Sequence, residues 1–198
     1  IYFLEVGASQ RPSKVVYDRA NSAISQVKAG EFDWDQILDG ADWFHFTGIT
    51  PALGDGAAAA TLEAVQAAKT KGVKVSADLN YRKKLWTPEK ASQVMSKLME
   101  YVDVGIGNEE DAEKVFGIKA GSTDVTSGQI DQEGYQQVAR KLVERFGFEK
   151  VAITLRESIS ASDNNWSALF YDGREFYRSR VYKVHIVDRV GGGDSFGG

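Results

Sequence analysis

Residues 187–198 read VDRVGGGDSFGG, a stretch in which three consecutive glycines precede an aspartate. Because glycine has no Cβ atom, Gly191, Gly192 and Gly193 leave their backbone N–H groups unobstructed and can adopt positive φ angles. If a helix begins at or just after Asp194, these N–H groups lie at its positive end and form an anion-binding hole. A carboxylate beside such a hole can accept a proton from a hydroxyl group while the hole holds a phosphoryl group. The stretch therefore favours phosphoryl transfer to a small molecule, although a glycine-rich run on its own is more typical of an ordinary loop.

Upstream of this stretch, short apolar runs alternate with helical patterns. Strands are predicted from β-branched and aromatic runs over residues 1–6, 14–19, 43–47, 73–78, 102–107, 150–155, 166–171 and 175–179. Helices are predicted over residues 34–38, 57–71, 87–101 and 131–146, with an acidic helix start at 108–111. Residues 49–53 and 118–130 are interpreted as loops, and Asp172-Gly173 as the two-residue turn of a hairpin.

This alternation, from Trp43 to Leu155, predicts an α/β fold with a mostly parallel sheet that is covered by helices on both faces. Ligands bind to such sheets at the carboxyl ends of the strands. The chain opens within a strand pattern, so we expect a further segment to precede it in the natural protein. With 198 residues it fits one domain, or most of a larger one.

The composition is that of a globular protein, with 42% hydrophobic and 26% charged residues. No apolar run is long enough to span a bilayer, and no cleavable leader is recognisable. The absence of cysteine excludes disulfides and thiolate metal sites, and it suits a cytoplasmic protein. A net charge of -4 with scattered basic residues disfavours nucleic acid as a partner. His45 and His185 lie far apart in the sequence, which disfavours a histidine metal site.

Polar side chains cluster where predicted strands end. Arg82 follows the strand that ends at Asp78, and its planar guanidinium can pair with a carboxylate through two hydrogen bonds. The alternative is a solvated basic turn formed by residues 82–84. Tyr17 and Arg19 lie two positions apart on a predicted strand, so their side chains share one face. They can meet a sugar-like ligand, or they can form a surface pair on an edge strand.

Residues 188–196, Asp-Arg-Val-Gly-Gly-Gly-Asp-Ser-Phe, resemble the C-terminal motif of the ribokinase-like (PfkB-type) sugar kinases, Asp-Thr-x-Gly-Ala-Gly-Asp-x-Phe. Arg189 stands where Thr is usual and Gly192 where Ala is usual, and neither change removes a backbone donor. The resemblance implies a three-layer fold with a mostly parallel central sheet and a small β lid. Residues 1–19 would be lid strands, and residues 20–198 would form part of the α/β core.

Three further stretches narrow the resemblance to the 2-keto-3-deoxygluconate kinases of that family. They are Gly48-Ile49-Thr50-Pro51-Ala52-Leu53, Asn80-Tyr81-Arg82 with the residues up to Trp86, and Tyr17-Asp18-Arg19. The resemblance implies that Arg82, Tyr17 and Arg19 hold the carboxylate end of the substrate, and that Ile49 lines the pocket. A neutral hexose would not require three such groups, so an acid sugar is the preferred substrate.

The resemblance also implies a nucleotide side of the site. Asn108-Glu109-Glu110-Asp111 is similar to the family's Asn-x-x-Glu motif, which acts near the magnesium and the phosphates, with the shorter Asp111 in place of Glu. The alternative is a plain helix start, where acidic residues suit the helix dipole. Thr154-Leu155-Arg156 resembles a Thr-Leu-Gly stretch that approaches the nucleotide. Asp188 would position the loop or a magnesium-bound water.

The function implied is ATP-dependent phosphorylation of 2-keto-3-deoxygluconate at its 6-hydroxyl, with Mg²⁺ as cofactor. Asp194 would be the general base, and the amides of the three glycines would hold the transferring group. One alternative is a ribokinase-like kinase for a neutral sugar such as fructose or ribose. Another is a non-catalytic sugar-acid-binding protein on the same fold.

Members of the family carry an N-terminal substrate motif and C-terminal helices that this sequence does not contain. We therefore expect the 198 residues to be inactive alone and the full-length protein to be the enzyme. Exposed lid strands often pair between subunits, so a homo-oligomer that associates through the lid is expected.

Overall fold

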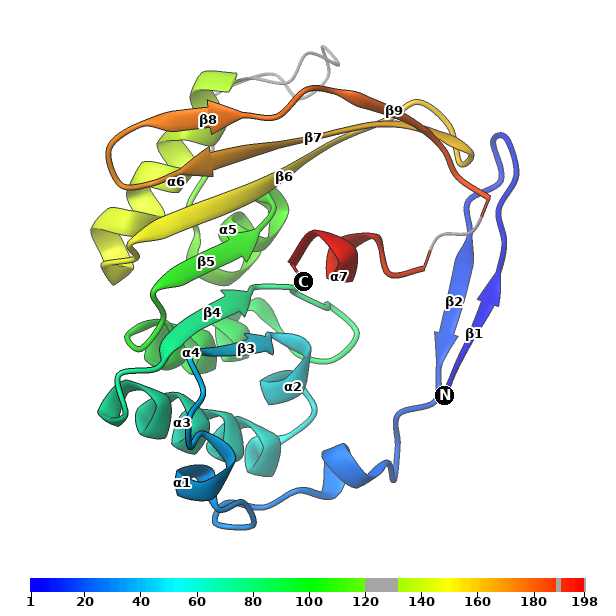
Figure 1. Cartoon of the computed structure of the whole chain (residues 1–198). Helices are drawn as coiled ribbons and strands as arrows, with labels where there is room; N and C mark the ends of the chain where they lie inside the picture. Colours follow the sequence, from blue (N-terminus) through cyan, green and yellow to red (C-terminus); the bar gives the residue numbers. More distant parts are fainter. Residues whose placement is uncertain (120–131, 188–189, 198) are drawn as a thin grey trace.

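The computed structural model describes residues 1–119, 132–187 and 190–197 and contains two β-sheets (Figure 1). The smaller sheet is an antiparallel pair of β1 (Tyr2–Glu5) and β2 (Lys14–Tyr17), and it stands apart from the main sheet. It meets the rest of the chain at its turn, where the N–H of Ala161 donates to the backbone oxygen of Ser9 over 2.8 Å. Two strands thus occur where lid strands are predicted, although β2 ends two residues before Arg19.

The main sheet has seven strands in the order β3-β4-β5-β6-β7-β8, with β9 also paired to β7. Their bounds are β3 Trp43–Thr47, β4 Lys74–Asp78, β5 Val104–Gly107, β6 Lys150–Ser158, β7 Asp163–Tyr171, β8 Phe176–Arg178 and β9 Tyr182–His185. Strands β3 to β6 are parallel, whereas β7, β8 and β9 continue the sheet in antiparallel fashion. The parallel part confirms the fold class that the alternation of strands and helices predicts.

The helices occupy the connections between these strands. Their bounds are η1 Ala23–Gln26, α1 Trp34–Ile37, α2 Ile49–Ala52, α3 Asp55–Thr70, α4 Pro88–Met99, α5 Glu109–Phe116, α6 Gln132–Phe146 and α7 Gly192–Gly197. The start of α4 follows from its sequence, because the Thr87 side chain accepts the N–H of Lys90 and Pro88 occupies the first helical turn. No helix among the described residues is both long and apolar enough to cross a membrane.

One face of the main sheet carries the hydrophobic core. Helices α3, α4, α5 and α6 contact one another in series, as expected when right-handed crossovers join strands that follow in sequence order. Alternate residues of β4 and β6 are buried in this core, including Val75, Ala77, Val151 and Ile153. Burial of these apolar side chains between the sheet and the helices is the main stabilising contribution to the fold.

Among the helices that the structure describes, α7 is the one that lies on the opposite face. A Cβ atom added at Gly192 would lie 3.8 Å from the Trp166 ring, and one added at Gly197 would lie 4.0 Å from the His45 ring. Both rings alternate with core residues along their strands, so they belong to the face that α3 to α6 leave uncovered. Helices therefore lie on both faces, as predicted, but the face that carries α7 is much less covered. Trp43, whose side chain lies on that face, has 53% of its surface exposed.

Several predicted boundaries are wrong. Residues 49–52, predicted as loop, form helix α2, because Pro51 is tolerated within a first helical turn. Four residues rather than two separate β7 from β8, since the Asp172 carboxylate accepts the N–H groups of Arg174 and Glu175 and so builds a wider turn. Strands β6 and β7 are longer than predicted, because residues 151–158 of β6 pair with residues 164–171 of β7. Most of the predicted 118–130 loop, and Asp131 at the predicted start of α6, lie outside the described residues.

Asp103 is a buried carboxylate at the amino end of β5. It accepts the N–H of Val75 over 2.8 Å and lies 3.1 Å from the Lys69 ammonium. Burial opposes its ionisation, but these hydrogen bonds and the charges of Lys69 and Lys74 hold its pKa below the usual range. A depressed pKa means that this stabilisation is fully present above the unfolded-state pKa of about 3.9 and is lost as the pH falls through the folded-state pKa.

Replacing Asp103 by Asn in the full-length protein is therefore expected to lower the free energy of unfolding at neutral pH by roughly 1.5–3 kcal/mol, the usual loss for hydrogen bonds to a charged group. The difference in the free energy of unfolding between the variant and the unmodified protein should become smaller as the pH falls to about 3. Urea unfolding at several pH values measures the free energy of unfolding of each protein. Glu149→Gln is the control, since Glu149 pairs with Lys74 at the surface, where ion pairs contribute little. An equal loss at every pH would contradict this role for the Asp103 charge.

Candidate active site

Helix α7 begins earlier than predicted. It spans Gly192–Gly197, so Gly192 and Gly193 lie within its first turn and Asp194 is its third residue rather than its start. Gly191 precedes it with φ of +71°, a left-handed conformation that glycine adopts without strain, and its backbone oxygen accepts the N–H of Ser195 over 2.8 Å. The glycine run is thus a turn that leads directly into a helix.

The N–H groups of Gly191, Gly192 and Gly193 donate no hydrogen bond to any part of the chain that the structure describes. The first N–H groups of a helix have no partner within the helix, and together with the helix dipole they attract an anion. Asp194 is exposed on the same turn, and a Cβ atom at Gly191 would lie 3.9 Å from its carboxylate oxygen Oδ2. A proton acceptor and unpaired backbone donors therefore occur side by side.

Asp78, for which the sequence suggested no role, is the acidic group that faces this helix. It ends β4 and lies on the sheet face that carries α7. Burial, joined by the negative charge of Asp194, raises the pKa of Asp78 to about 6, although the N–H of Asn80 and the charge of Arg82 act in the opposite direction. An aspartate as the last residue of a predicted strand was the sequence feature that could have identified it.

Arg82 lies in the connection between β4 and α4 and has an exposed side chain. Its positive charge opposes the burial that raises the pKa of Asp78 and Asp111, so the guanidinium lies within electrostatic range of the last residue of β4 and of a residue in the first turn of α5. Asp194 also acts electrostatically on Asp78, so the structure brings Arg82 and Asp194 into the same region around Asp78. An exposed cation at this position can bind an anionic group of a ligand.

The connection that carries Arg82 has an unusual shape at Asn80, whose φ of +39° is uncommon for a residue other than glycine. The Asn80 side chain donates to the Thr47 hydroxyl over 3.0 Å, and the N–H of Gly48 donates to the backbone oxygen of Asp78 over 2.8 Å. A Cβ atom at Gly48 would lie 2.1 Å from the backbone oxygen of Leu79, so only glycine allows this close approach. These contacts hold the ends of β3 and β4 together.

Asn108 and Asp111 form the start of α5. The Asn108 side chain accepts the N–H of Asp111 over 2.8 Å, and the Asp111 carboxylate accepts the N–H of Asn108 over 3.3 Å, which completes a capping box. The other carboxylate oxygen of Asp111 accepts the N–H of Tyr81 over 3.0 Å. Burial, with a contribution from the charge of Asp78, raises the pKa of Asp111 to about 7. The predicted helix start is confirmed.

Thr154 and Arg156 lie on β6, beyond the point where β5 ends. The Thr154 hydroxyl donates to the backbone oxygen of Gly107 over 3.4 Å, which places it beside the residue that precedes Asn108. Arg156 is exposed and pairs with Trp166 across the β6–β7 ladder. The strand continues through both residues, so they are not at its end, where the sequence had placed them. Asp188 lies outside the described residues.

The remaining predicted residues come from two elements. The Arg19 guanidinium lies 4.2 Å from the centre of the Tyr17 ring, so these side chains are paired although Arg19 lies beyond the end of β2. Ile49 is the first residue of α2 and is partly buried. Figure 1 shows α7 between the carboxyl ends of the strands and the β1–β2 pair.

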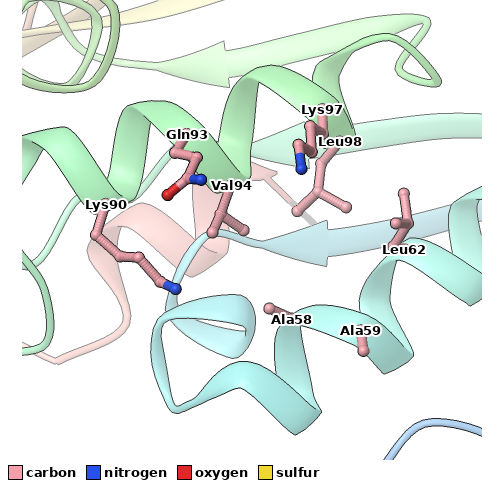
Figure 2. A pocket seen from close by; sticks show the side chains of 8 residues that line it. All are labelled: Ala58, Ala59, Leu62, Lys90, Gln93, Val94, Lys97 and Leu98. Carbon is pink, nitrogen blue, oxygen red and sulfur yellow. The ribbon is translucent and has the colours of Figure 1, made fainter.

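A separate groove lies on the outer side of the helix layer (Figure 2). It measures about 190 Å³, and its lining consists of Ala58, Ala59 and Leu62 of α3 with Lys90, Gln93, Val94, Lys97 and Leu98 of α4. Lys90 forms an ion pair with Asp55 over 2.9 Å. The groove has no acidic lining residue that could accept a proton, so the strand ends beside α7 remain the candidate active site.

Comparison with known proteins identifies the family to which the chain belongs. The 2-dehydro-3-deoxygluconokinase of Thermotoga maritima has a solved structure that superposes with a TM-score of 0.92 and 54% identity, over 99% of this chain and 57% of that one. The 2-dehydro-3-deoxygalactonokinase of Haloferax volcanii is 33% identical over 197 residues, and the 2-dehydro-3-deoxygluconokinase of Thermoproteus tenax is 27% identical over 192 residues. These matches cover 100% and 94% of this chain but 55% and 49% of the relatives, so the chain spans about half of their length. Residues 1–198 match the pfkB family of carbohydrate kinases throughout, and the chain belongs to that family.

Proposed function

We propose that the full-length protein phosphorylates 2-keto-3-deoxygluconate, also called 2-dehydro-3-deoxygluconate, at its 6-hydroxyl with ATP. The observation that carries the proposal is the position of Asp194 beside the amides of the glycine run, which donate no hydrogen bond to the described part of this pfkB-family chain. The names of the similar proteins support a sugar acid as the substrate.

In this reaction the 6-oxygen of the sugar attacks the γ-phosphorus of ATP, and the bond to the oxygen that bridges to the β-phosphate breaks. Asp194 accepts the hydroxyl proton as the new bond forms. The amides of Gly191, Gly192 and Gly193 hold the negative oxygens of the transferring group. Arg82, with Tyr17 and Arg19 from the β1–β2 pair and Ile49 from α2, binds the acid end and body of the sugar.

The residues present fit a magnesium nucleotide. Mg²⁺ prefers oxygen ligands and is usually held by the nucleotide phosphates and water with only one or two carboxylates, and the carboxylates of Asp78 and Asp194 lie within electrostatic range of each other beside α7. Bound Mg²⁺ would neutralise the phosphate charge. Asn108 at the start of α5, with Thr154 and Arg156 on the part of β6 that extends beyond β5, would face the nucleotide. Asp188, which lies outside the described residues, would position the loop or a magnesium-bound water. An indirect contribution of Asp111 to the magnesium site is what the sequence resemblance implies.

An enzyme that uses ATP in this way is expected in the cytoplasm. We also propose a homo-oligomer that associates through the β1–β2 pair. Phe3 and Val16 of that pair have 62% and 52% of their surfaces exposed, and an uncovered two-stranded sheet has unpaired edges.

A second candidate substrate is 2-keto-3-deoxygalactonate, because the relative that is 33% identical is a 2-dehydro-3-deoxygalactonokinase. Both acids carry a terminal carboxylate that Arg82 would bind in the same way. Two further hypotheses, a kinase for a neutral sugar and a non-catalytic acid-binding protein, predict different outcomes in the same assay.

Coupled ADP release by the full-length protein tests the proposal. The panel contains both 2-keto-3-deoxy acids, gluconate, fructose and ribose, each assayed with and without Mg²⁺. We expect Mg²⁺-dependent turnover with one or both keto acids and a far lower kcat/KM for the neutral sugars. Turnover with fructose or ribose alone would identify a neutral-sugar kinase. Binding of the acids without any ADP release would identify a non-catalytic protein.

A further inference from the structure

Asp111 joins two loops that belong to opposite sides of the candidate active site. One carboxylate oxygen accepts the N–H of Tyr81, which precedes Arg82, and the other accepts the N–H of Asn108. The first partner is 30 positions away in sequence, whereas the second is only three away. A capping box needs only the local bond to Asn108, so the bond to Tyr81 is an additional contact that helix formation does not explain.

The segment that Asp111 holds is one that needs external support. Its Asn80 has a φ of +39°, and such conformations persist only when neighbouring groups stabilise them. On one side of Asn80, Leu79 donates its N–H to the backbone oxygen of Ile106 over 2.9 Å. On the other side, the N–H of Tyr81 is held by Asp111. Arg82 is the next residue, so the direction in which its exposed side chain leaves the backbone depends on this bond.

We propose that Asp111 is a positioning residue for substrate recognition, which fixes the Arg82 loop against the start of α5 and thereby aligns the acid end of the sugar with the phosphoryl donor. The inference rests on the proposed function and extends it. Both oxygens of Asp111 are already committed to backbone N–H groups, and the residue has only 7% of its surface exposed. A buried carboxylate whose two oxygens already accept backbone N–H groups is poorly available to a magnesium-bound water.

Kinetics of the Asp111→Asn and Asp111→Glu variants of the full-length protein separate positioning from a metal role. Asn retains one acceptor oxygen, so one of the two N–H bonds is lost. We expect the KM for 2-keto-3-deoxygluconate to rise roughly tenfold, the effect of one lost charge-assisted hydrogen bond, with kcat and the Mg²⁺ requirement little changed. Glu can still bond the Asn108 N–H but is one methylene longer at Tyr81, so the sugar KM should again rise. A weaker apparent affinity for Mg²⁺ in Asp111→Asn, restored by Glu, with an unchanged sugar KM would overturn the proposal.

A double-mutant cycle with Arg82→Leu tests whether Asp111 acts through Arg82. If it does, Asp111→Asn should lower kcat/KM in the presence of Arg82 and have little further effect once Arg82 is replaced. Additive losses would contradict the proposal. Asp103→Asn is the matched control, because Asp103 is also a buried carboxylate that accepts a backbone N–H, at the opposite end of β5. It should lower stability and leave the sugar KM unchanged.

Amide hydrogen exchange provides a readout that needs no catalysis. In the full-length protein, Asp111→Ala, which removes both acceptor oxygens, should increase the exchange rate of the Tyr81 amide by roughly tenfold or more, whereas Asp103→Asn should not. Unchanged protection of Tyr81 would overturn the positioning role even in an active enzyme. Faster exchange in a protein without sugar-acid kinase activity would show instead that the loop is held as described and that the proposed function is wrong.

Discussion

Replacing Asp194 by Asn in the full-length protein is expected to lower kcat for 2-keto-3-deoxygluconate by roughly 10²–10⁴-fold, the usual contribution of a general base. The amide has almost the same size and shape but cannot accept the hydroxyl proton. Asp194 lies on the exposed first turn of α7 and makes no hydrogen bond to another side chain in the described part of the chain, so its replacement should not disturb the fold. Steady-state kinetics at saturating ATP measure the loss.

The binding of both substrates distinguishes a lost base from a damaged site. Calorimetry should give nearly unchanged dissociation constants for the sugar acid and for the magnesium nucleotide in Asp194→Asn. Asp39→Asn, an exposed aspartate in the turn after α1, is the control and should retain full activity. Phosphoryl transfer at the normal rate in Asp194→Asn would show that Asp194 is not the general base and that another group accepts the hydroxyl proton.

Arg82→Leu is expected to raise the KM for 2-keto-3-deoxygluconate by roughly a hundredfold, because a carboxylate then loses a charge-assisted and bidentate partner. The effect should be confined to acid substrates, so any slow turnover of a neutral sugar should remain as it was. Arg82→Lys retains the charge but not the planar fork and should give an intermediate KM. Kinetics on an acid and a neutral sugar measure the difference.

Lys83→Leu is the matched control for this experiment. Lys83 is the next residue, also exposed, and belongs to the same basic run. If Arg82 only contributes to a solvated basic turn, the two leucine variants should behave alike. Equal KM values for Arg82→Leu and Lys83→Leu would therefore reject the carboxylate-binding role, whereas a large rise in Arg82→Leu alone would support it.

The local features of the fold were predictable because short-range chemistry determines them. Thr87 and Pro88 mark the start of α4, and Asn108 marks that of α5, since a cap depends only on residues within one turn. Boundaries that depend on a partner strand were missed. The extension of β6 to Ser158 follows from its pairing with β7, and no property of those polar residues by themselves indicates a strand.

For the candidate site, the sequence indicated which residues matter but not how they meet. The order of the glycine run and Asp194 indicated a carboxylate beside free amides, although α7 begins two residues earlier than predicted. The role of Asp78 was missed because its raised pKa depends on burial and on the nearby Asp194, which lies far along the chain. The positions of Tyr17 and Arg19 relative to Arg82 likewise depend on how the β1–β2 pair is placed.

The sequence by itself determined the α/β class, the glycine turn before α7 and the capped helix starts, because hydrophobic periodicity, glycine conformation and capping act within a few residues. Only the tertiary structure decided that Asp111 binds Tyr81 through one oxygen, and that Asp78, Arg82 and Asp194 share one electrostatic environment. The physical reason is the parallel sheet, which brings the carboxyl ends of strands that are distant in sequence to the same edge. Burial and charge at that edge depend on the side chains that surround each group in space.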